Sequence, residues 1–283
     1  MHHEEIKKTV LAALKEDIGA GDITTTLVVG SSHKSKGVIL TREDVVLCGM
    51  AFAHEVFSLL DPKMEFMAHF KDGDKVKKGA SLITLNGKTR AILTGERVAL
   101  NFLSYLSAIA TRTHFFTEAV KPYPVKILDT RKTTPCARPI ERYAVRCGGG
   151  VNHRFNLHDM VLLKDNHRVI SREKEKLSET VRRLHIKTHK KIEIEVDHLW
   201  ELEEVLKAHP EMVLLDNMTP LELKKAVVMT RKCCPNKPPL LEASGGITLE
   251  NVKKIAATGV DRISVGSLTH SRKAIDMTLE LMG

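Results

Sequence analysis

The stretch 192–217 opens with Ile192-Glu193-Ile194-Glu195-Val196-Asp197 and closes with Met212-Val213-Leu214-Leu215-Asp216-Asn217. Each of these segments is a short apolar run that ends in acidic or amide residues, and the residues between them favour a helix. A strand, a helix and a second strand in this order place the two strands parallel in one sheet. Parallel strands covered on both faces have near-continuous apolar sequences. The stretch therefore predicts an α/β fold.

The same alternation extends from this stretch in both directions. Further strands are expected at 125–128, 160–163, 240–243 and 262–265, with helical segments between and after them. Polar or glycine residues follow every strand. An α/β barrel builds its active site from the loops at the carboxyl ends of its strands, whereas an open doubly wound sheet gathers ligand groups at one switch point. Six polar strand ends favour the barrel.

The first part of the chain has a less regular pattern. We expect helices at 4–17 and 51–60, strands at 37–40, 45–47, 65–70 and 81–85, and one long helix or two joined helices over 89–120. This change of pattern divides the chain into domains at 1–112 and 113–283. A last helix, from Arg272, could pack back on the first domain.

Composition limits the class of protein. The chain has 283 residues, of which 42% are hydrophobic and 28% charged, as in ordinary folded proteins. It contains no apolar run long enough to span a membrane, and Met1-His2-His3-Glu4-Glu5 lacks the order of a signal peptide, so we expect a cytoplasmic protein. The five cysteines show no CxxC spacing and are expected to be reduced thiols: Cys48, Cys136, Cys147, Cys233 and Cys234.

Positive charge is concentrated in one region. The formal net charge is +9, and over half of the excess lies between Arg131 and Arg168. Nucleic-acid binding is one alternative, but such proteins add aromatic stacking groups, and aromatic residues are only 4% of this chain. Arg131, Lys132, Arg154 and Lys164 lie near strand ends, close in sequence to Gly148-Gly149-Gly150 and His153. They favour a pocket for a small anion over a set of surface salt bridges, because guanidinium groups bind carboxylates in bidentate fashion.

Two other groups of residues stand at strand ends. Ser244-Gly245-Gly246 with Thr248 as a helix N-cap, together with Gly266-Ser267, predicts a phosphate site, although a glycine pair alone is usually a turn. Glu195 and Asp216 offer oxygen ligands suited to Mg²⁺. These acids could equally stabilise a cationic centre, hold sugar hydroxyls or neutralise a lysine, and Glu193 could be the partner of such a lysine.

Taken together, these motifs closely resemble the quinolinate phosphoribosyltransferase family of type II phosphoribosyltransferases. The resemblance covers nearly the whole chain. It is carried by Glu16-Asp17-Ile18-Gly19, Gly21-Asp22-Ile23-Thr24, Asp129-Thr130-Arg131-Lys132-Thr133-Thr134-Pro135, Cys147-Gly148-Gly149-Gly150-Val151-Asn152-His153-Arg154, Leu163-Lys164-Asp165-Asn166-His167, Glu193-Ile194-Glu195-Val196, Leu215-Asp216-Asn217-Met218 and Glu242-Ala243-Ser244-Gly245-Gly246-Ile247. One departure is Cys136-Ala137, where the family's pattern has Gly-Leu.

The resemblance implies a fold and a set of site residues. It implies an N-terminal α/β sandwich domain, an incomplete (open) α/β barrel and a homodimer whose active site is shared. The implied residues surrounding quinolinate and the phosphates are Arg131, Lys132, His153, Arg154 and Lys164, with Arg97 reaching in from the partner subunit. Glu195 and Asp216 lie by the ribose and Mg²⁺-pyrophosphate, and Ser244, Gly245, Gly246, Gly266 and Ser267 lie around the 5′-phosphate. Lys132, Glu195 and Asp216 are the expected catalytic residues.

The implied reaction is transfer of phosphoribosyl from phosphoribosyl pyrophosphate to quinolinate with decarboxylation, giving nicotinate mononucleotide in NAD biosynthesis. Two alternatives remain. A related phosphoribosyltransferase would act on nicotinate without decarboxylation, or a divergent paralogue would use another anionic acceptor, although a monocarboxylate needs fewer cations. A basic nucleic-acid-binding protein would bind duplex in a salt-dependent manner. We expect no nucleic acid and no membrane as partners.

Overall fold

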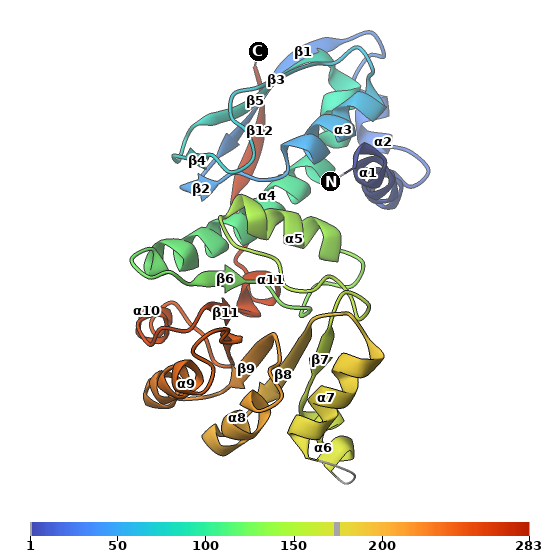
Figure 1. Ribbon diagram of the computed structural model, residues 1–283. Helices are drawn as coiled ribbons and strands as arrows, with labels where there is room; N and C mark the ends of the chain where they lie inside the picture. The colour runs from blue at the N-terminus through green and yellow to red at the C-terminus, as the bar shows by residue number, and fades with distance from the viewer. Residues whose placement is uncertain (1, 173–175, 283) are drawn as a thin grey trace. The chain divides into compact units, whose positions relative to one another are not determined.

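The computed structural model describes residues 2–172 and 176–282 (Figure 1). The chain forms two compact units. Unit 1 contains residues 2–114, 134–149 and 269–282, and unit 2 contains residues 115–133 and 150–268 apart from 173–175. No helix of the described ranges has the length and apolar character needed to cross a membrane.

Unit 1 is built on a four-stranded antiparallel sheet with the strand order β12-β1-β5-β3. Strand β1 lies between β12 and β5 and pairs with both of them. The bounds are β1 (Lys34–Thr41), β3 (Glu65–Ala68), β5 (Ser81–Lys88) and β12 (Met277–Met282), with a separate pair formed by β2 (Val45–Val46) and β4 (Lys75–Val76).

The end of the chain corrects one prediction. Residues 277–282 form the strand β12, where the sequence pattern had predicted a helix beginning at Arg272. Its register with β1 runs from Thr41 opposite Met277 to Lys36 opposite Met282. In a segment of only six residues, the spacing of the apolar positions fits a helix as well as a strand. The strand with which it pairs, β1, lies far away in the sequence. Tertiary pairing therefore decides the conformation.

The helices expected at 4–17, 51–60 and 89–120 are present, and α2 is an additional helix that the sequence pattern did not predict. The segment 89–120 is one helix, which settles whether it forms one helix or two. At Gly95 an added Cβ would lie 2.9–3.0 Å from side-chain atoms of Leu60, Phe57 and Val56, so this glycine lets α4 pack closely against α3. The bounds are α1 (His3–Ile18), α2 (Ile23–Val28), α3 (Met50–Leu60), α4 (Thr89–Val120) and α5 (Arg138–Cys147).

Unit 2 is a six-stranded parallel sheet with the order β6-β11-β10-β9-β8-β7. A closed barrel in chain order would need these five pairings and a sixth between β6 and β7. Within the described ranges that sixth pairing is replaced by a single bridge, in which the Val151 N–H donates to Ile127 O (2.8 Å) and the Asp129 N–H donates to Val151 O (3.2 Å). The predicted incomplete barrel is thus confirmed, and the opening lies between its first two strands.

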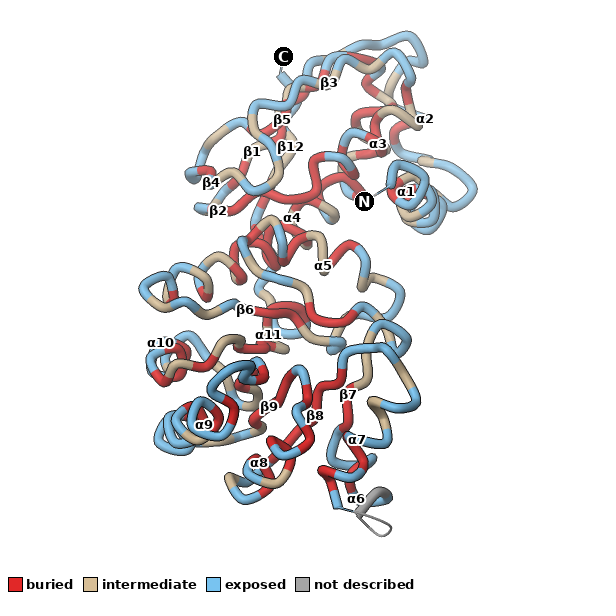
Figure 2. Tube along the Cα trace, in the orientation of Figure 1, coloured by how far each residue is buried: buried red, intermediate tan, exposed pale blue. Residues whose placement is uncertain are grey.

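Helices follow most of these strands and lie around their outer side (Figure 1). The strands are the most deeply buried part of the unit, whereas α8 and α9 expose their outer faces (Figure 2). The bounds are β6 (Lys126–Leu128), β7 (Val161–Leu163), β8 (Ile192–Val196), β9 (Met212–Asp216), β10 (Leu240–Ser244) and β11 (Arg262–Ser264), with α6 (Asp165–Arg172), α7 (Leu177–Lys187), α8 (Leu199–Leu206), α9 (Pro220–Cys233), α10 (Val252–Ala256) and α11 (Ser267–His270).

Candidate active site

The six strands of unit 2 bring the predicted polar groups to one edge of the sheet. Because the strands are parallel, their carboxyl ends lie on the same side, and Ser244 at the end of β10 is in register with Asp216 at the end of β9. All predicted site residues except Arg97 belong to unit 2. Arg97 is exposed on α4 in unit 1, and its contribution to the site stays a prediction.

Cationic side chains gather beside the end of β6. Arg131 and Lys132 are exposed in the loop that follows this strand, while Arg154 is buried and its Nη1 donates to Met160 O (3.2 Å). Burial and the nearby charge of Arg131 both lower the pKa of Arg154. Like charges held this close repel each other, so an anion bound between them is favoured. That these two arginines form an anion pocket stays a prediction.

A buried carboxylate positions the segment that carries Arg154. Asp129 directly follows β6 and has no solvent exposure. Its Oδ1 accepts from the His153 N–H (2.7 Å) and its Oδ2 accepts from Asn152 Nδ2 (2.6 Å). Sequence reasoning gave Asp129 no role of its own. A charged residue at the end of a buried strand is the signal that could have identified this positioning group.

His153 points into an ionic cluster among buried side chains. Its Nε2 lies 3.1 Å from Glu193 Oε2 and 3.2 Å from Glu242 Oε1, and Arg262 Nε lies 2.9 Å from Glu242 Oε2. Burial by itself lowers the pKa of His153, but the two carboxylates more than offset this effect and raise it to about 9. The ion partner of Glu193 is therefore His153 and not a lysine, which the sequence analysis had named as one possible partner. The predicted role of His153 toward substrate stays a prediction.

Glu195 and Asp216 meet a third acid at the ends of adjacent strands. Oxygens of Glu195, Asp197 and Asp216 lie within 4.8 Å of one another. Lys164 Nζ lies 3.6 Å from Glu195 Oε2, and the Asp165 N–H donates to Glu195 Oε1 (3.2 Å). Burial raises the pKa of Glu195, and the Lys164 charge opposes that shift. Three carboxylates are a donor set that fits Mg²⁺, and Asp197 is the member that sequence reasoning missed.

The glycine segment after β10 is shaped by the neighbouring strand end. Gly245 has φ +88°, and a Cβ added there would lie 2.1 Å from Asn217 Oδ1, so a side chain at this position is excluded. Asn217 also ties the two strand ends together, because its N–H donates to Ser244 O (2.9 Å). Gly246 has open space around it. Gly266 and Ser267 follow the next strand and are partly exposed.

One detail of the predicted phosphate site is wrong. Thr248 is not an N-cap, because α10 begins at Val252. The side chain of Asn251 accepts from the Thr248 N–H (2.9 Å) and donates to Gly246 O (2.8 Å). These bonds hold 246–251 as a turn, and the helix after it has only five residues. A phosphate here would depend on the exposed glycine backbone more than on a helix dipole.

Cys136 has a strained backbone. Its φ is +63°, in the left-handed region that disfavours residues with a Cβ. This is the position where the family's pattern has glycine. The departure seen in the sequence therefore falls where the main chain requires the conformation that glycine adopts at no cost.

Comparisons with known proteins agree with this arrangement. The family described as quinolinate phosphoribosyl transferase, N-terminal domain, matches residues 22–107, and the corresponding C-terminal domain matches residues 109–280. The Bacillus subtilis protein named probable nicotinate-nucleotide pyrophosphorylase (carboxylating) is 38% identical over 99% of this chain and 95% of its own length. The Nicotiana tabacum quinolinate phosphoribosyltransferase (decarboxylating) 1b is 37% identical over 98% of this chain and 82% of its own.

A comparison with solved structures finds proteins of the same kind. The nicotinate-nucleotide pyrophosphorylase from Francisella tularensis superposes with a TM-score of 0.91 at 37% identity, covering 100% of this chain and 98% of that one. Both family descriptions, relatives of nearly equal length and the open parallel barrel lead to one assignment. The chain belongs to the quinolinate phosphoribosyltransferase family.

Proposed function

We propose that this chain is a decarboxylating quinolinate phosphoribosyltransferase, an enzyme of the glycosyltransferase class. It would convert quinolinate and phosphoribosyl pyrophosphate into nicotinate mononucleotide, pyrophosphate and CO₂. The observation that carries the proposal is that Arg131 lies near the buried Arg154 beside the end of β6, while a cluster of carboxylates lies at the ends of β8 and β9 in the same parallel sheet. The names of the relatives support the same reaction.

The cations would bind the two carboxylates of quinolinate. Arg154 is held by its bond to Met160 O and by the Asp129 contacts of the two preceding residues, so it offers a fixed guanidinium. Arg131 and Lys132 would approach from the loop after β6, and Lys164 from the end of β7. His153 directly precedes Arg154 in the chain. Quinolinate has two carboxylates and can therefore bind several of these cations at once. Nicotinate has only one carboxylate and needs fewer of them.

The acidic cluster and the glycine segments would hold the phosphoribosyl group. As the bond from C1 to pyrophosphate breaks, positive charge develops on C1, and the carboxylates of Glu195 and Asp216 would stabilise it. Glu195, Asp197 and Asp216 would also hold Mg²⁺, which would supply positive charge against the leaving pyrophosphate. Ser244, Gly245, Gly246, Gly266 and Ser267 would surround the 5′-phosphate. Lys132 would serve as a further cation beside the reacting groups.

The acceptor chemistry follows from charge. The pyridine nitrogen attacks C1 and becomes a pyridinium. When the C2 carboxylate departs as CO₂, the electron pair of the broken bond stays on C2, where the adjacent positive nitrogen stabilises it, and a proton then binds C2 in place of the carboxylate. Quinolinate can follow this course because its second carboxylate stands beside the ring nitrogen.

The assembly and location belong to the same proposal. We propose a homodimer in which the exposed Arg97 of one subunit reaches the site of the other, as the family resemblance implies. Cytoplasmic location is proposed from the five free cysteines. Nucleic acid is not a proposed partner.

A substrate assay tests the proposal. Purified protein is given quinolinate or nicotinate with phosphoribosyl pyrophosphate and Mg²⁺, and CO₂ and nicotinate mononucleotide are measured. Both products should form from quinolinate. Lys164→Ala, at the carboxyl end of β7, should lower this rate, whereas the matched control Lys191→Ala, before the amino end of β8, should not. Turnover of nicotinate alone, or salt-sensitive binding of duplex DNA without turnover, would overturn the proposal.

A further inference from the structure

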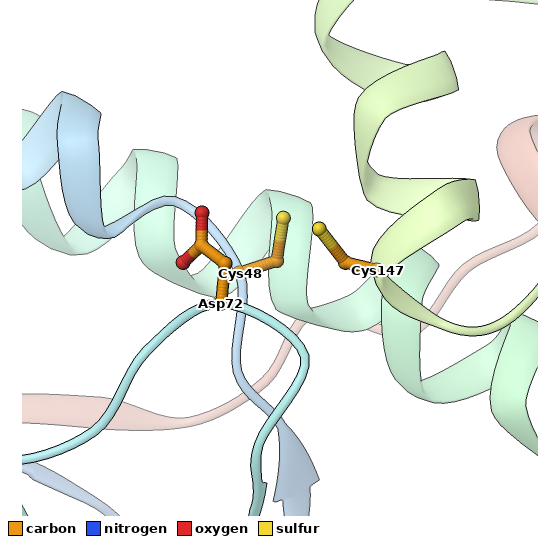
Figure 3. Close-up of side chains that lie close together, drawn as sticks. All are labelled: Cys48, Asp72 and Cys147. Atoms are coloured by element: carbon orange, nitrogen blue, oxygen red, sulfur yellow. The ribbon is translucent and has the colours of Figure 1, made fainter.

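Unit 1 contains a cluster of metal-ligating side chains that the proposed reaction does not use. Sulfur atoms of Cys48 and Cys147 and a carboxylate oxygen of Asp72 lie within 4.8 Å of one another. The two thiols face each other, with the carboxylate beside Cys48 (Figure 3). Cys48 lies between β2 and α3, Asp72 between β3 and β4, and Cys147 is the last residue of α5. These positions are too far apart in sequence to form a motif.

The three side chains are held in place by neighbouring groups. Asp72 Oδ1 accepts from the N–H groups of Gly49 and Met50, each at 3.0 Å, and Oδ2 accepts from Tyr143 Oη (2.7 Å). These bonds fix the carboxylate and leave it room for one further partner, because two carboxylate oxygens accept about four bonds. Such outer contacts are what orient metal ligands in proteins.

The two cysteines are also held in position or accessible to an ion. Ser107 Oγ accepts from the Cys48 N–H (2.9 Å) and donates to Cys48 O (3.1 Å), so the main chain of Cys48 is fixed on α4. Cys48 is buried, whereas Cys147 is partly exposed and offers a route by which an ion can reach the cluster.

Charge favours a cation at this point. Two thiolates and a carboxylate held this close together repel one another, so their charged forms are disfavoured without a counter-ion. A bound cation would reverse this balance. Cys147 also ends a helix, where the carbonyl groups give a partial negative charge that favours a cation. Thiolate sulfur selects zinc-like ions over Mg²⁺, so this cluster differs in chemistry from the acidic cluster of the barrel.

We propose that Cys48, Asp72 and Cys147 form a binding site for a thiophilic divalent cation of the Zn²⁺ class, with a water molecule in the fourth position. Binding would release the two thiol protons to solvent and form two metal–sulfur bonds and one metal–oxygen bond. Ligand atoms on a tetrahedral zinc lie roughly 3.6–3.8 Å apart, given bond lengths of about 2.3 Å to sulfur and 2.1 Å to oxygen. The ligand atoms of this cluster already lie within 4.8 Å of one another, so they would need to move only slightly closer together to bind the ion.

The site would join three segments of unit 1. It would fix the loop before α3, the turn between β3 and β4, and the end of α5, after which the chain continues into Gly148-Gly149-Gly150. The ion would therefore stabilise unit 1, and this effect can be measured without any substrate.

The test uses the full chain, reduced and freed of metal with a chelator. Co²⁺ is titrated in, and the sulfur-to-cobalt charge-transfer absorption is recorded, followed by displacement with Zn²⁺. One equivalent should bind and produce this absorption. Cys147→Ser should abolish it, Cys48→Ser should do the same, and Asp72→Asn should weaken Co²⁺ affinity at least tenfold. The matched controls Cys136→Ser and Cys233→Ser, at two exposed cysteines, should bind as the wild type does.

A melting experiment guards against misfolded variants. Zn²⁺ should raise the Tm of the wild type and of both control variants, and it should leave the Tm of folded Cys147→Ser unchanged. The proposal is overturned if the wild type gives no charge-transfer absorption, if folded Cys147→Ser binds Co²⁺ as tightly as the wild type, or if the absorption is lost in a control variant instead. Formation of a disulfide between Cys48 and Cys147 in the presence of Zn²⁺ would also overturn it.

Discussion

The imidazole Nε2 of His153 lies 3.1 Å from a carboxylate oxygen of Glu193, and both side chains are buried in unit 2. Glu242 Oε1 lies 3.2 Å from the same nitrogen. Removing the imidazole would leave the two carboxylates with the half-buried Arg262, which pairs with Glu242, and with the nearby charge of Arg154. The loop that carries Arg154 thus depends on charge balance among strand side chains.

His153→Ala should lower the free energy of unfolding by about 3–5 kcal/mol, because breaking a buried ion pair leaves an uncompensated charge. Urea denaturation followed by circular dichroism measures the loss. Glu193→Gln and the double variant complete a cycle, and the loss in the double variant should be smaller than the sum of the two single losses. Additive losses would show that His153 and Glu193 do not interact.

Stability should also depend on pH through His153. Its pKa is raised from 6.5 to about 9, so the contribution is fully present below pH 6.5 and is lost as pH rises through 9. A shift of this size corresponds to roughly 3 kcal/mol. The backbone N–H of Arg154 donates to His153 Nδ1 (2.7 Å), which favours the neutral imidazole because Nδ1 then acts as an acceptor. The two carboxylates beside Nε2 favour the charged imidazolium more strongly. NMR titration of the imidazole should show it charged at pH 7, and a neutral ring there would contradict the prediction.

Cys136→Gly should stabilise the protein by about 0.5–1 kcal/mol. A residue with a Cβ pays about 1–2 kcal/mol to adopt a left-handed conformation, and part of this gain is lost to the greater freedom of glycine in the unfolded chain. Cys136→Ala serves as the control, since it removes the sulfur and keeps the strain. Equal midpoints of urea unfolding for the two variants would show that the backbone conformation is not the cause.

Arg154→Ala should weaken quinolinate binding by roughly 2–5 kcal/mol, because it removes a charge-assisted contact from a buried position. Steady-state kinetics should show a raised KM for quinolinate. Arg182→Ala is the matched control, an exposed arginine of the same unit that donates to Lys207 O (3.2 Å). Near-normal KM and kcat in Arg154→Ala would show that this arginine does not bind substrate.

Arg97 is tested by mixing two inactive proteins. Arg97→Ala and Arg154→Ala subunits are combined and allowed to exchange, and activity is assayed. If the site is shared between subunits, a mixed dimer regains one intact site and activity returns. If exchange is demonstrated by mass and no activity returns, the shared-site proposal should be abandoned.

Much of unit 2 could be predicted because its information is local. Each buried parallel strand is a short apolar run, and each strand end carries its own polar residues, as Val196-Asp197 and Leu215-Asp216 show. Parallel pairing then brings these ends to one edge of the sheet, whatever the details of packing. The sequence also indicated that 136 was an unusual position, before the backbone conformation explained why.

Other features depend on contacts between distant segments, which periodicity does not encode. The conformation of 277–282 follows from pairing with β1, and the start of α10 follows from the bonds of the Asn251 side chain. The sequence by itself determined the α/β class, the cationic segment and the family. Only the tertiary structure decided that His153 pairs with Glu193 and that Cys48 faces Cys147, because a side chain's partner is set by which strands and helices pack together in three dimensions.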